Sequence, residues 1–96
     1  MFRIYWTEEA EKDFESILSY YLENASFRVA ELVYARIKEQ VETLKTFPER
    51  TRIGRVSGTR EHVFHKLPYI AIVNIDNDTV SILNIVHSAR KYPSDS

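Results

Sequence analysis

The sequence contains no cysteine, only two glycines and only three prolines among its 96 residues. The absence of cysteine rules out a disulfide framework and a thiolate metal site, and it fits a protein of the reducing cytoplasm. So few glycines and prolines argue against a disordered or low-complexity chain. No apolar run approaches the ~20 residues that a membrane-spanning helix needs, and the N-terminus lacks the basic and then apolar layout of a signal peptide. We therefore expect a single cytoplasmic domain over residues 1–96 with no membrane segment.

The charged residues are unevenly distributed, although the formal net charge is only −1. Residues 1–48 hold six basic and nine acidic side chains, whereas residues 49–96 hold seven basic and five acidic ones. A surface that binds anions is therefore expected in the second half of the chain. The molecule as a whole lacks the strong positive field of a protein that is held on nucleic acid mainly by phosphate neutralisation.

The first half has the pattern of one strand and two helices. Alternating aromatic and β-branched residues predict a strand over residues 2–6. Thr7 can cap the helix that follows, in which apolar residues recur at helical spacing to about residue 24. Ser26 can cap a second helix, which we expect to end near Phe47 because Pro48 disfavours a helical conformation in the residue before it.

The second half has the pattern of a basic loop followed by strands. Residues 48–58 have no apolar period and carry three arginines around Gly54, which predicts a basic loop with room for a short edge strand. Strands are predicted over residues 59–66, 69–75 and 79–87. Leu67-Pro68 forms the first turn between them, and Asp76-Asn77-Asp78 forms a hairpin because Asn and Asp tolerate left-handed backbone angles.

This order of elements predicts an α+β fold, β-α-α-β-β-β, in which two antiparallel helices cover one face of the sheet. Both strands at the centre are apolar on both faces. Alternation places Ile70 and Ile72 opposite Ala71, Val73 and Ile75, and it places Val80, Ile82 and Val86 opposite Leu83 and Ile85. We expect the second face of the sheet to stay open and to be covered by a partner.

Four fragments in a fixed order resemble the ParE/RelE toxin superfamily of bacterial type II toxin–antitoxin modules, some members of which are named plasmid-stabilisation proteins. They are Trp6 before a capped helix, Gly58-Thr59-Arg60-Glu61 at the start of a strand, Pro68-Tyr69 before an apolar strand, and the sequence HSARKYP at residues 87–93. The resemblance extends from about Ile4 to Pro93. It implies a helical hairpin on a small, mainly antiparallel sheet, and a cognate antitoxin whose C-terminal segment wraps the toxin in a hetero-oligomer.

The superfamily divides by target. RelE-like members resemble ribosome-dependent endoribonucleases, and ParE-like members are described as poisons of DNA gyrase. Cleavage of RNA through the 2′-hydroxyl needs a base, an acid and cations that stabilise the transition state. His87 and Tyr92 could transfer protons and Arg60 and Arg90 could supply positive charge, so these four residues are the catalytic set if the chain is a ribonuclease.

Each of these residues also has a structural interpretation. His87 could bond to a backbone group, and Arg60 could pair with Glu61 or with an acid of the second helix. Arg90 and Lys91 could bond to the chain end or to Glu61. His62 and His65 are expected on the same face of one strand, but without a third ligand in register they predict no metal site. No cofactor is expected.

Two features favour the ParE-like branch. The loop after the second helix contains no lysine, and the isoelectric point of about 6.3 is low for a protein that must hold a phosphodiester in the ribosome. Our preferred hypothesis is a toxin that binds gyrase without being an enzyme. Its target-binding residues would be the cationic group of Arg55, Arg60, Lys66, Arg90 and Lys91. The alternatives are a ribosome-dependent mRNA endoribonuclease and a regulatory member that only binds its antitoxin.

Overall fold

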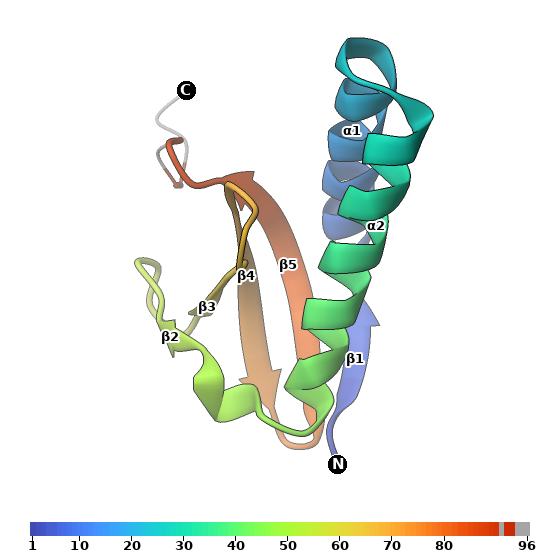
Figure 1. Cartoon of the computed structure of the whole chain (residues 1–96). Helices are drawn as coiled ribbons and strands as arrows, with labels where there is room; N and C mark the ends of the chain where they lie inside the picture. Colours follow the sequence, from blue (N-terminus) through green and yellow to red (C-terminus); the bar gives the residue numbers. More distant parts are fainter. Residues whose placement is uncertain (91, 94–96) are drawn as a thin grey trace.

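The computed structural model describes residues 1–90, 92 and 93, in which a hairpin of two helices lies on one side of a five-stranded sheet (Figure 1). The elements in order are β1 (Arg3–Trp6), α1 (Glu8–Asn24), α2 (Phe27–Glu42), the 3-10 turns η1 (Thr43–Lys45) and η2 (Pro48–Arg50), β2 (Arg52–Ile53), β3 (Arg60–Val63), β4 (Tyr69–Asp76) and β5 (Thr79–His87). The strand order in the sheet is β1-β5-β4-β3-β2, with β1 parallel to β5 and all other neighbours antiparallel. The predicted α+β fold, including the short edge strand β2, is confirmed.

Both predicted helix caps are present. The Thr7 hydroxyl oxygen accepts a hydrogen bond from the Ala10 amide at 3.2 Å, and the same hydroxyl donates to the Ile82 carbonyl oxygen at 2.7 Å. Thr7 therefore caps α1 and also attaches its start to β5. The Ser26 hydroxyl accepts from the Val29 amide at 3.1 Å and starts α2. Such caps satisfy amides that the first turn of a helix leaves without a partner.

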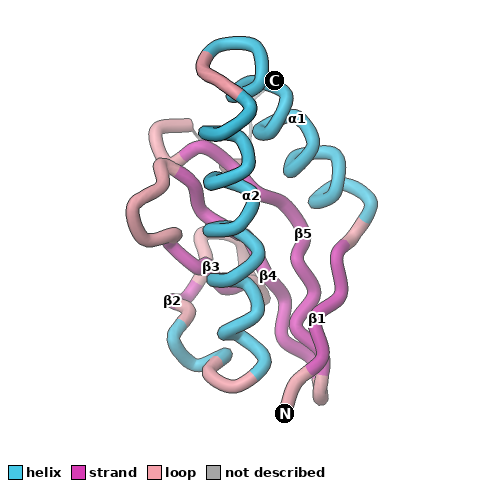
Figure 2. The backbone as a smooth tube through the Cα atoms, turned by 45° about the vertical axis from the view of Figure 1, so that its right-hand side comes forward, coloured by secondary structure: helices cyan, strands magenta, loops and turns pink. Residues whose placement is uncertain are grey.

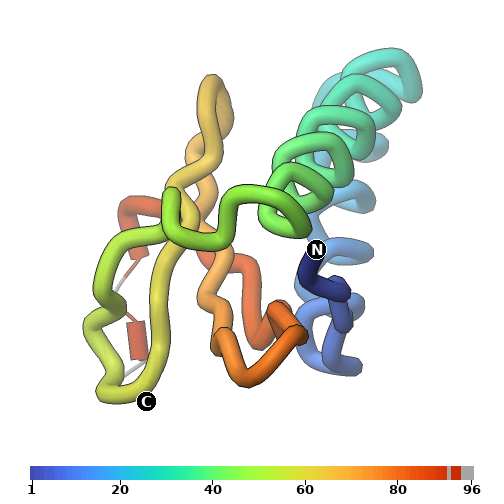
Figure 3. The backbone as a smooth tube through the Cα atoms, turned by 90° about the horizontal axis from the view of Figure 1, so that it is seen from below, coloured from blue at the N-terminus to red at the C-terminus, as the bar shows by residue number. Residues whose placement is uncertain are grey.

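The second helix ends five residues earlier than predicted. Phe47 is not helical, as Pro48 requires, but α2 already stops at Glu42 and tightens into η1. The Thr43 hydroxyl donates to the Gln40 carbonyl at 2.6 Å and so competes for an acceptor of the last helical turn. From there the chain crosses through η1 and η2 from the helix layer to the outer edge of the sheet, as the view from below shows (Figure 3).

The strand predicted over residues 59–66 is shorter in the structure, and so is the first strand, which begins at Arg3. β3 ends at Val63, and Lys66 closes the following turn with a left-handed φ of 63°. His65 therefore lies in the turn and not in the strand. The expectation that His62 and His65 share a strand face is wrong.

A β-bulge in β5 corrects the predicted alternation of its side chains. Ile72 is paired with Asn84 but Val73 with Ile82, so Leu83 is an extra residue between them. The extra residue reverses the side on which all later residues point. As a result Ile85 lies with Val80 and Ile82 in the core below the helices, and not with Leu83 as predicted. Figure 2 shows α2 in front of this central part of the sheet.

The sheet face that points away from the helices is largely covered by the chain itself, which corrects our expectation of an open face. Ile70 is 4% exposed and Ile72 is 0% exposed. The Asn74 side-chain amide donates to the Gly58 carbonyl at 3.1 Å, so the loop after β2 is bonded to this face. On the same face, the Tyr92 hydroxyl donates to the side-chain oxygen of Asn84, the residue paired with Ile72, at 3.0 Å.

In the part of the chain that the structure describes, neither helix combines the length and the apolar character needed to cross a membrane.

Candidate functional site

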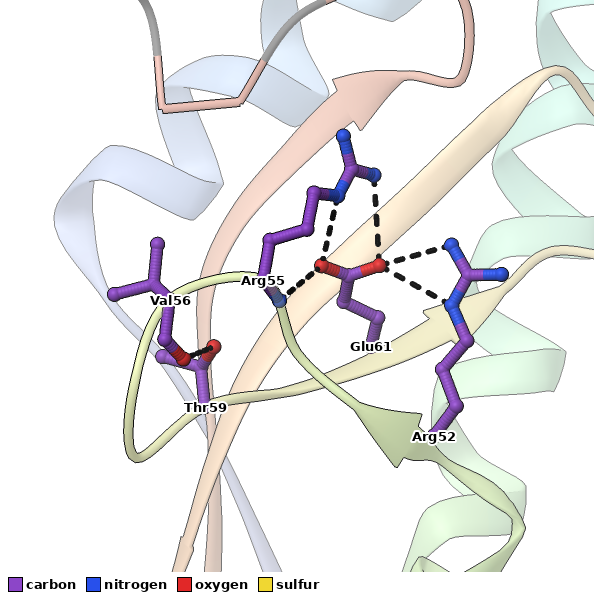
Figure 4. A network of polar contacts seen from close by, with 5 residues as sticks. All are labelled: Arg52, Arg55, Val56, Thr59 and Glu61. Carbon is purple, nitrogen blue, oxygen red and sulfur yellow. Dashed lines mark hydrogen bonds and ion pairs between the residues drawn. The ribbon is translucent and has the colours of Figure 1, made fainter.

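The buried carboxylate of Glu61 organises the outer edge of the sheet (Figure 4). Glu61 lies on β3 opposite Arg52 of β2, and its side chain is only 2% exposed. Arg52 donates from Nε and Nη2 to Glu61 Oε1 at 3.2 and 2.9 Å. Arg55 donates from Nε to Oε2 at 3.1 Å and from Nη2 to Oε1 at 3.4 Å, and its backbone amide donates to Oε2 at 3.0 Å. One acid therefore holds two guanidinium groups and the start of a loop.

The loop over residues 54–59 has a fixed shape. Thr59 donates from its hydroxyl to the Val56 carbonyl at 2.6 Å, and the Gly54 amide donates to the Thr59 carbonyl at 2.9 Å. A side chain at residue 54 would not fit, because a Cβ there would lie 2.2 Å from the Thr59 hydroxyl oxygen. Gly58 has a φ of +81°, which only glycine adopts without strain. These contacts place the Arg55 amide on the Glu61 carboxylate.

The environment of Glu61 favours its ionised form. Burial alone would raise the pKa of this carboxyl group, but the hydrogen bonds from the Arg55 amide and from the Arg52 and Arg55 guanidinium groups outweigh it. The pKa of Glu61 therefore lies below its ordinary value, and the carboxylate stays charged at neutral pH.

Arg60 does not pair with Glu61 or with an acid of α2. Its Nε donates to the hydroxyl oxygen of Thr51 at 2.7 Å, and its Nη2 donates to the carbonyl oxygen of the same residue. Arg60 and Glu61 are consecutive on β3, so their side chains leave opposite faces of the sheet. Thr51 is 4% exposed, and sequence reasoning missed it as a partner.

His87 lies at the end of β5, in an open groove between α1 and β5 of about 840 Å³. Its ring meets the ring of Tyr69 edge to face, with the centroids 5.5 Å apart. His87 Nδ1 accepts a hydrogen bond from the Ala89 amide at 3.1 Å. The lone pair of this nitrogen is therefore engaged, and in the neutral ring the proton is on Nε2. The structural interpretation of His87 is confirmed in that the ring bonds to a backbone amide, although the residue is exposed and not partly buried.

Tyr92 is held by Asn84, which also contacts α1. The Asn84 amide donates to Asp13 Oδ2 at 3.1 Å, and the Ile85 backbone amide donates to the same oxygen at 2.9 Å. Asp13 thus satisfies an amide on the part of β5 that extends beyond β1. Burial raises the pKa of the Tyr92 hydroxyl, and the carboxylates of Glu9, Asp13 and Glu61 raise it further. The hydroxyl of Tyr92 therefore stays protonated and acts as a donor to Asn84.

The proposed catalytic set does not converge on one point. Arg90 lines the same groove as His87, and Tyr92 bonds to Asn84 at the side of that groove. Arg60 lies two strands away, on β3, and is bonded to Thr51. Lys66 is exposed in the turn after β3, and Lys91 lies outside the described residues. Of the predicted target-binding group, the structure places Arg55 and Arg60 at the outer edge of the sheet.

Gln40 on α2 is a further residue that the sequence did not identify. Its side-chain oxygen accepts from the His65 backbone amide at 2.8 Å, and its side-chain nitrogen donates to the His65 carbonyl at 3.0 Å. His62 Nε2 lies 3.3 Å from the same oxygen, and burial lowers the pKa of His62. Gln40 thus attaches the turn after β3 to the helix layer. Among the described residues, no group of three or more His, Asp or Glu side chains is arranged to hold a metal ion.

Comparisons with known proteins agree with this architecture. A family model described as "ParE toxin of type II toxin-antitoxin system, parDE" matches residues 4–92. A Sinorhizobium fredii protein named "Putative toxin Y4kP" is 36% identical over 91 residues, which cover 95% of this chain and 93% of that protein. A solved chain of the chromosomal ParDE toxin–antitoxin system from P. aeruginosa superposes with a TM-score of 0.84 at 25% identity, covering 91% of this chain and 96% of the other.

The match of nearly the whole chain to this family, together with a superposable fold, identifies the protein as a member of the ParE toxin family of type II toxin–antitoxin systems.

Proposed function

We propose that this ParE-family toxin inhibits growth in the cytoplasm by binding DNA gyrase, and that a cognate antitoxin neutralises it in a hetero-oligomeric complex. The observation that carries the proposal is the state of the groups that RNA cleavage would require. The Nδ1 lone pair of His87 is engaged by the Ala89 amide, the Tyr92 hydroxyl donates its hydrogen bond to Asn84, and Arg60 lies two strands away on β3, bonded to Thr51. A toxin that acts by binding needs no proton-transfer group, so this arrangement favours binding over ribonuclease chemistry.

The surface of the helical hairpin supports a protein partner. Several large apolar side chains near its tip are exposed, with exposed fractions of 57% for Tyr20, 50% for Leu22, 70% for Phe27 and 49% for Leu32. Exposed apolar side chains that gather on one element are typical of a protein–protein contact. An antitoxin segment that covers the hairpin would remove them from water.

The gyrase proposal is tested with purified toxin, gyrase and relaxed plasmid. We expect the toxin to inhibit supercoiling, and expression without antitoxin to arrest growth. A ribosome-bound mRNA cleavage assay run in parallel tests the alternative. Growth arrest with normal gyrase activity and with mRNA cleavage would replace our proposal by the ribonuclease. Absence of any growth arrest would leave a regulatory member of the family.

The variant His87→Ala distinguishes the two mechanisms within one protein. If His87 transfers a proton during RNA cleavage, its removal should lower activity by about 10²–10⁴-fold. If the toxin acts by binding gyrase, growth arrest by His87→Ala should remain close to that of the wild type. The antitoxin claim is tested by thermal unfolding, where the product of a small neighbouring reading frame should raise the melting temperature of the toxin. No increase with any neighbouring product would contradict it.

A further inference from the structure

Four arginines surround the outer edge of the sheet. They are Arg50 at the end of η2, Arg52 on β2, Arg55 in the loop after it, and Arg60 on β3. We call these four residues the arginine edge. Residues 49–61 contain these four arginines and two glutamates, so the segment carries a net charge of +2 in a protein whose net charge is −1.

Three of the four guanidinium groups are already fixed by the protein. Arg52 and Arg55 each use Nε and Nη2 on Glu61, and Arg60 uses Nε and Nη2 on Thr51. Among the described residues, no hydrogen bond uses the Nη1 atom of any of them. A guanidinium group has five N–H donors in a planar fork, so each one keeps its Nη1 side for another acceptor. Because the long side chains are already ordered, a ligand would not have to immobilise them.

The charge distribution around the sheet favours a polyanion at this edge. Carboxylates near the opposite edge include Glu9 and Asp13 of α1, and Asp78, which pairs with Arg3 of β1 at 3.3 Å. The strand order places β2 and β1 at opposite edges of the sheet, and α1 follows β1 directly (Figure 1). A polyanion that approaches β2 therefore meets guanidinium groups first and has the acidic helix on the far side.

The edge is poorly suited to binding another protein by strand addition. β2 contains only two residues, which is too short to serve as a template for a further strand. Guanidinium forks, in contrast, match the oxygens of phosphate groups in a bidentate manner. Among the described residues near these arginines, Ile53 is the most exposed large apolar side chain, at 82%, and Phe47, whose ring lies 4.1 Å from the Arg50 guanidinium, is 39% exposed; a protein partner would use Ile53 first.

We infer that the arginine edge binds the phosphodiester backbone of duplex DNA. This role rests on the proposed action on gyrase: the DNA is the duplex segment that gyrase itself holds. The contact involves two to four phosphates and is weak in the free toxin, because the protein as a whole is slightly negative. Gyrase supplies the main affinity, and the arginine edge adds contacts to the DNA that gyrase holds.

The first test needs no gyrase. Binding of the wild-type toxin to a labelled DNA duplex of about 25 bp is followed by fluorescence anisotropy between about 20 and 100 mM salt. Each phosphate contact adds about −0.9 to the slope of log K against log salt, so we expect a slope between about −2 and −4. The double variant Arg50→Gln/Arg52→Gln leaves Arg55 on Glu61, and it should make the slope about 1.8 shallower and weaken binding at 20 mM salt on the order of 100-fold or more.

The matched control is Arg3→Gln/Arg28→Gln, which removes the same charge from β1 and α2. Its slope should stay within about 0.5 of the wild-type slope. Equal losses in both double variants, no binding by the wild type at 20 mM salt, or preference for an RNA duplex would each overturn the assignment. If Arg50→Gln/Arg52→Gln does not fold, the single variant Arg50→Gln should still make the slope about 0.9 shallower, and an unchanged slope would overturn it.

The second test separates this inference from the proposed function. With gyrase and plasmid, the arginine double variant should need about tenfold more toxin for half-inhibition of supercoiling, while its binding to gyrase without DNA stays within about twofold of wild type. If Ile53→Ser reduces inhibition as much as the arginine variant does, the edge contacts protein and the DNA assignment is wrong. If the wild type does not inhibit gyrase, the proposed function fails, and the DNA-only assay still decides whether the edge binds DNA.

Discussion

The substitution Glu61→Gln tests whether one buried carboxylate holds the outer edge of the sheet. The side chain is nearly isosteric, but one carboxylate oxygen becomes an amide nitrogen. If the nitrogen replaces Oε2, the amide and the Nε of Arg55 lose their acceptor. If it replaces Oε1, the donors of Arg52 and the Nη2 of Arg55 lose theirs. In either orientation at least two donors that now point at an acceptor would point at another donor.

The magnitude follows from the exposure of the partners. Hydrogen bonds to a charged group contribute about 1.5–3 kcal/mol each. The side chains of Arg52 and Arg55 are 57% and 39% exposed, so water can replace part of what they lose. We expect a loss of about 2–3 kcal/mol in the free energy of unfolding, which corresponds to a melting temperature lower by roughly 10–20 °C for a chain of this size.

The unfolding can be followed in urea at pH 7 through the fluorescence of Trp6, the single tryptophan, whose ring stacks on Phe14 with the centroids 5.3 Å apart. Hydrogen exchange at the Arg55 amide should become faster by a larger factor than exchange in β4. The control Asp78→Asn removes the exposed pair of Arg3 and Asp78, and we expect it to leave the free energy of unfolding close to that of the wild type. A Glu61→Gln variant within 0.5 kcal/mol of the wild type would refute the role assigned to this carboxylate.

Three further predictions concern the same surfaces. Folding lowers the pKa of Glu61, so on acidification the unfolded chain binds a proton at a higher pH than the folded protein does. The stability that Glu61 contributes is therefore present above about pH 4.5 and is lost as the pH falls through the pKa of the folded state. In a urea series between about pH 6 and pH 3.5, the wild type should lose more stability than Glu61→Gln does. Ile72→Ala should lower the free energy of unfolding by about 3–4 kcal/mol because that side chain is fully buried, whereas Ile53→Ala, at 82% exposure, should lower it by less than about 0.5 kcal/mol. If urea unfolding shows an equally small loss for both variants, the second face of the sheet is open. Gln40→Ala should cost about 1–2 kcal/mol and speed hydrogen exchange at the His65 amide, and unchanged exchange there would show that the turn does not depend on Gln40.

Local chemistry made several elements predictable. Thr7 and Ser26 are placed directly before apolar residues at helical spacing, so both helix starts could be predicted from the neighbouring residues. The hairpin at residues 76–78 was predictable for the same reason, and Asn77 adopts a left-handed φ of 52°. The alternation of side chains along a strand also places Arg60 and Glu61 on opposite faces, which argues from sequence alone against an ion pair between them.

The site depended on pairings that a linear sequence does not contain. The bulge at Leu83 exists because β4 and β5 change register, and it moved Ile85 into the core. The cover on the second sheet face arises because the loop after β2 bonds to Asn74. For this reason the open face was predicted wrongly, although the alternation of apolar residues on β4 was correct.

Residues that are neighbours in the chain specify the order of strands and helices, the helix caps, the hairpin and the positive charge of the second half, so these features could be predicted before folding was considered. Which acid holds which arginine depends on tertiary packing, because Glu61 meets Arg52 through strand pairing and Arg55 through a folded loop. The same packing turned His87 and Tyr92 from proton-transfer candidates into partners of a backbone amide and a side-chain amide. Contacts of this kind depend on register and loop geometry, which are settled only when distant segments pack together.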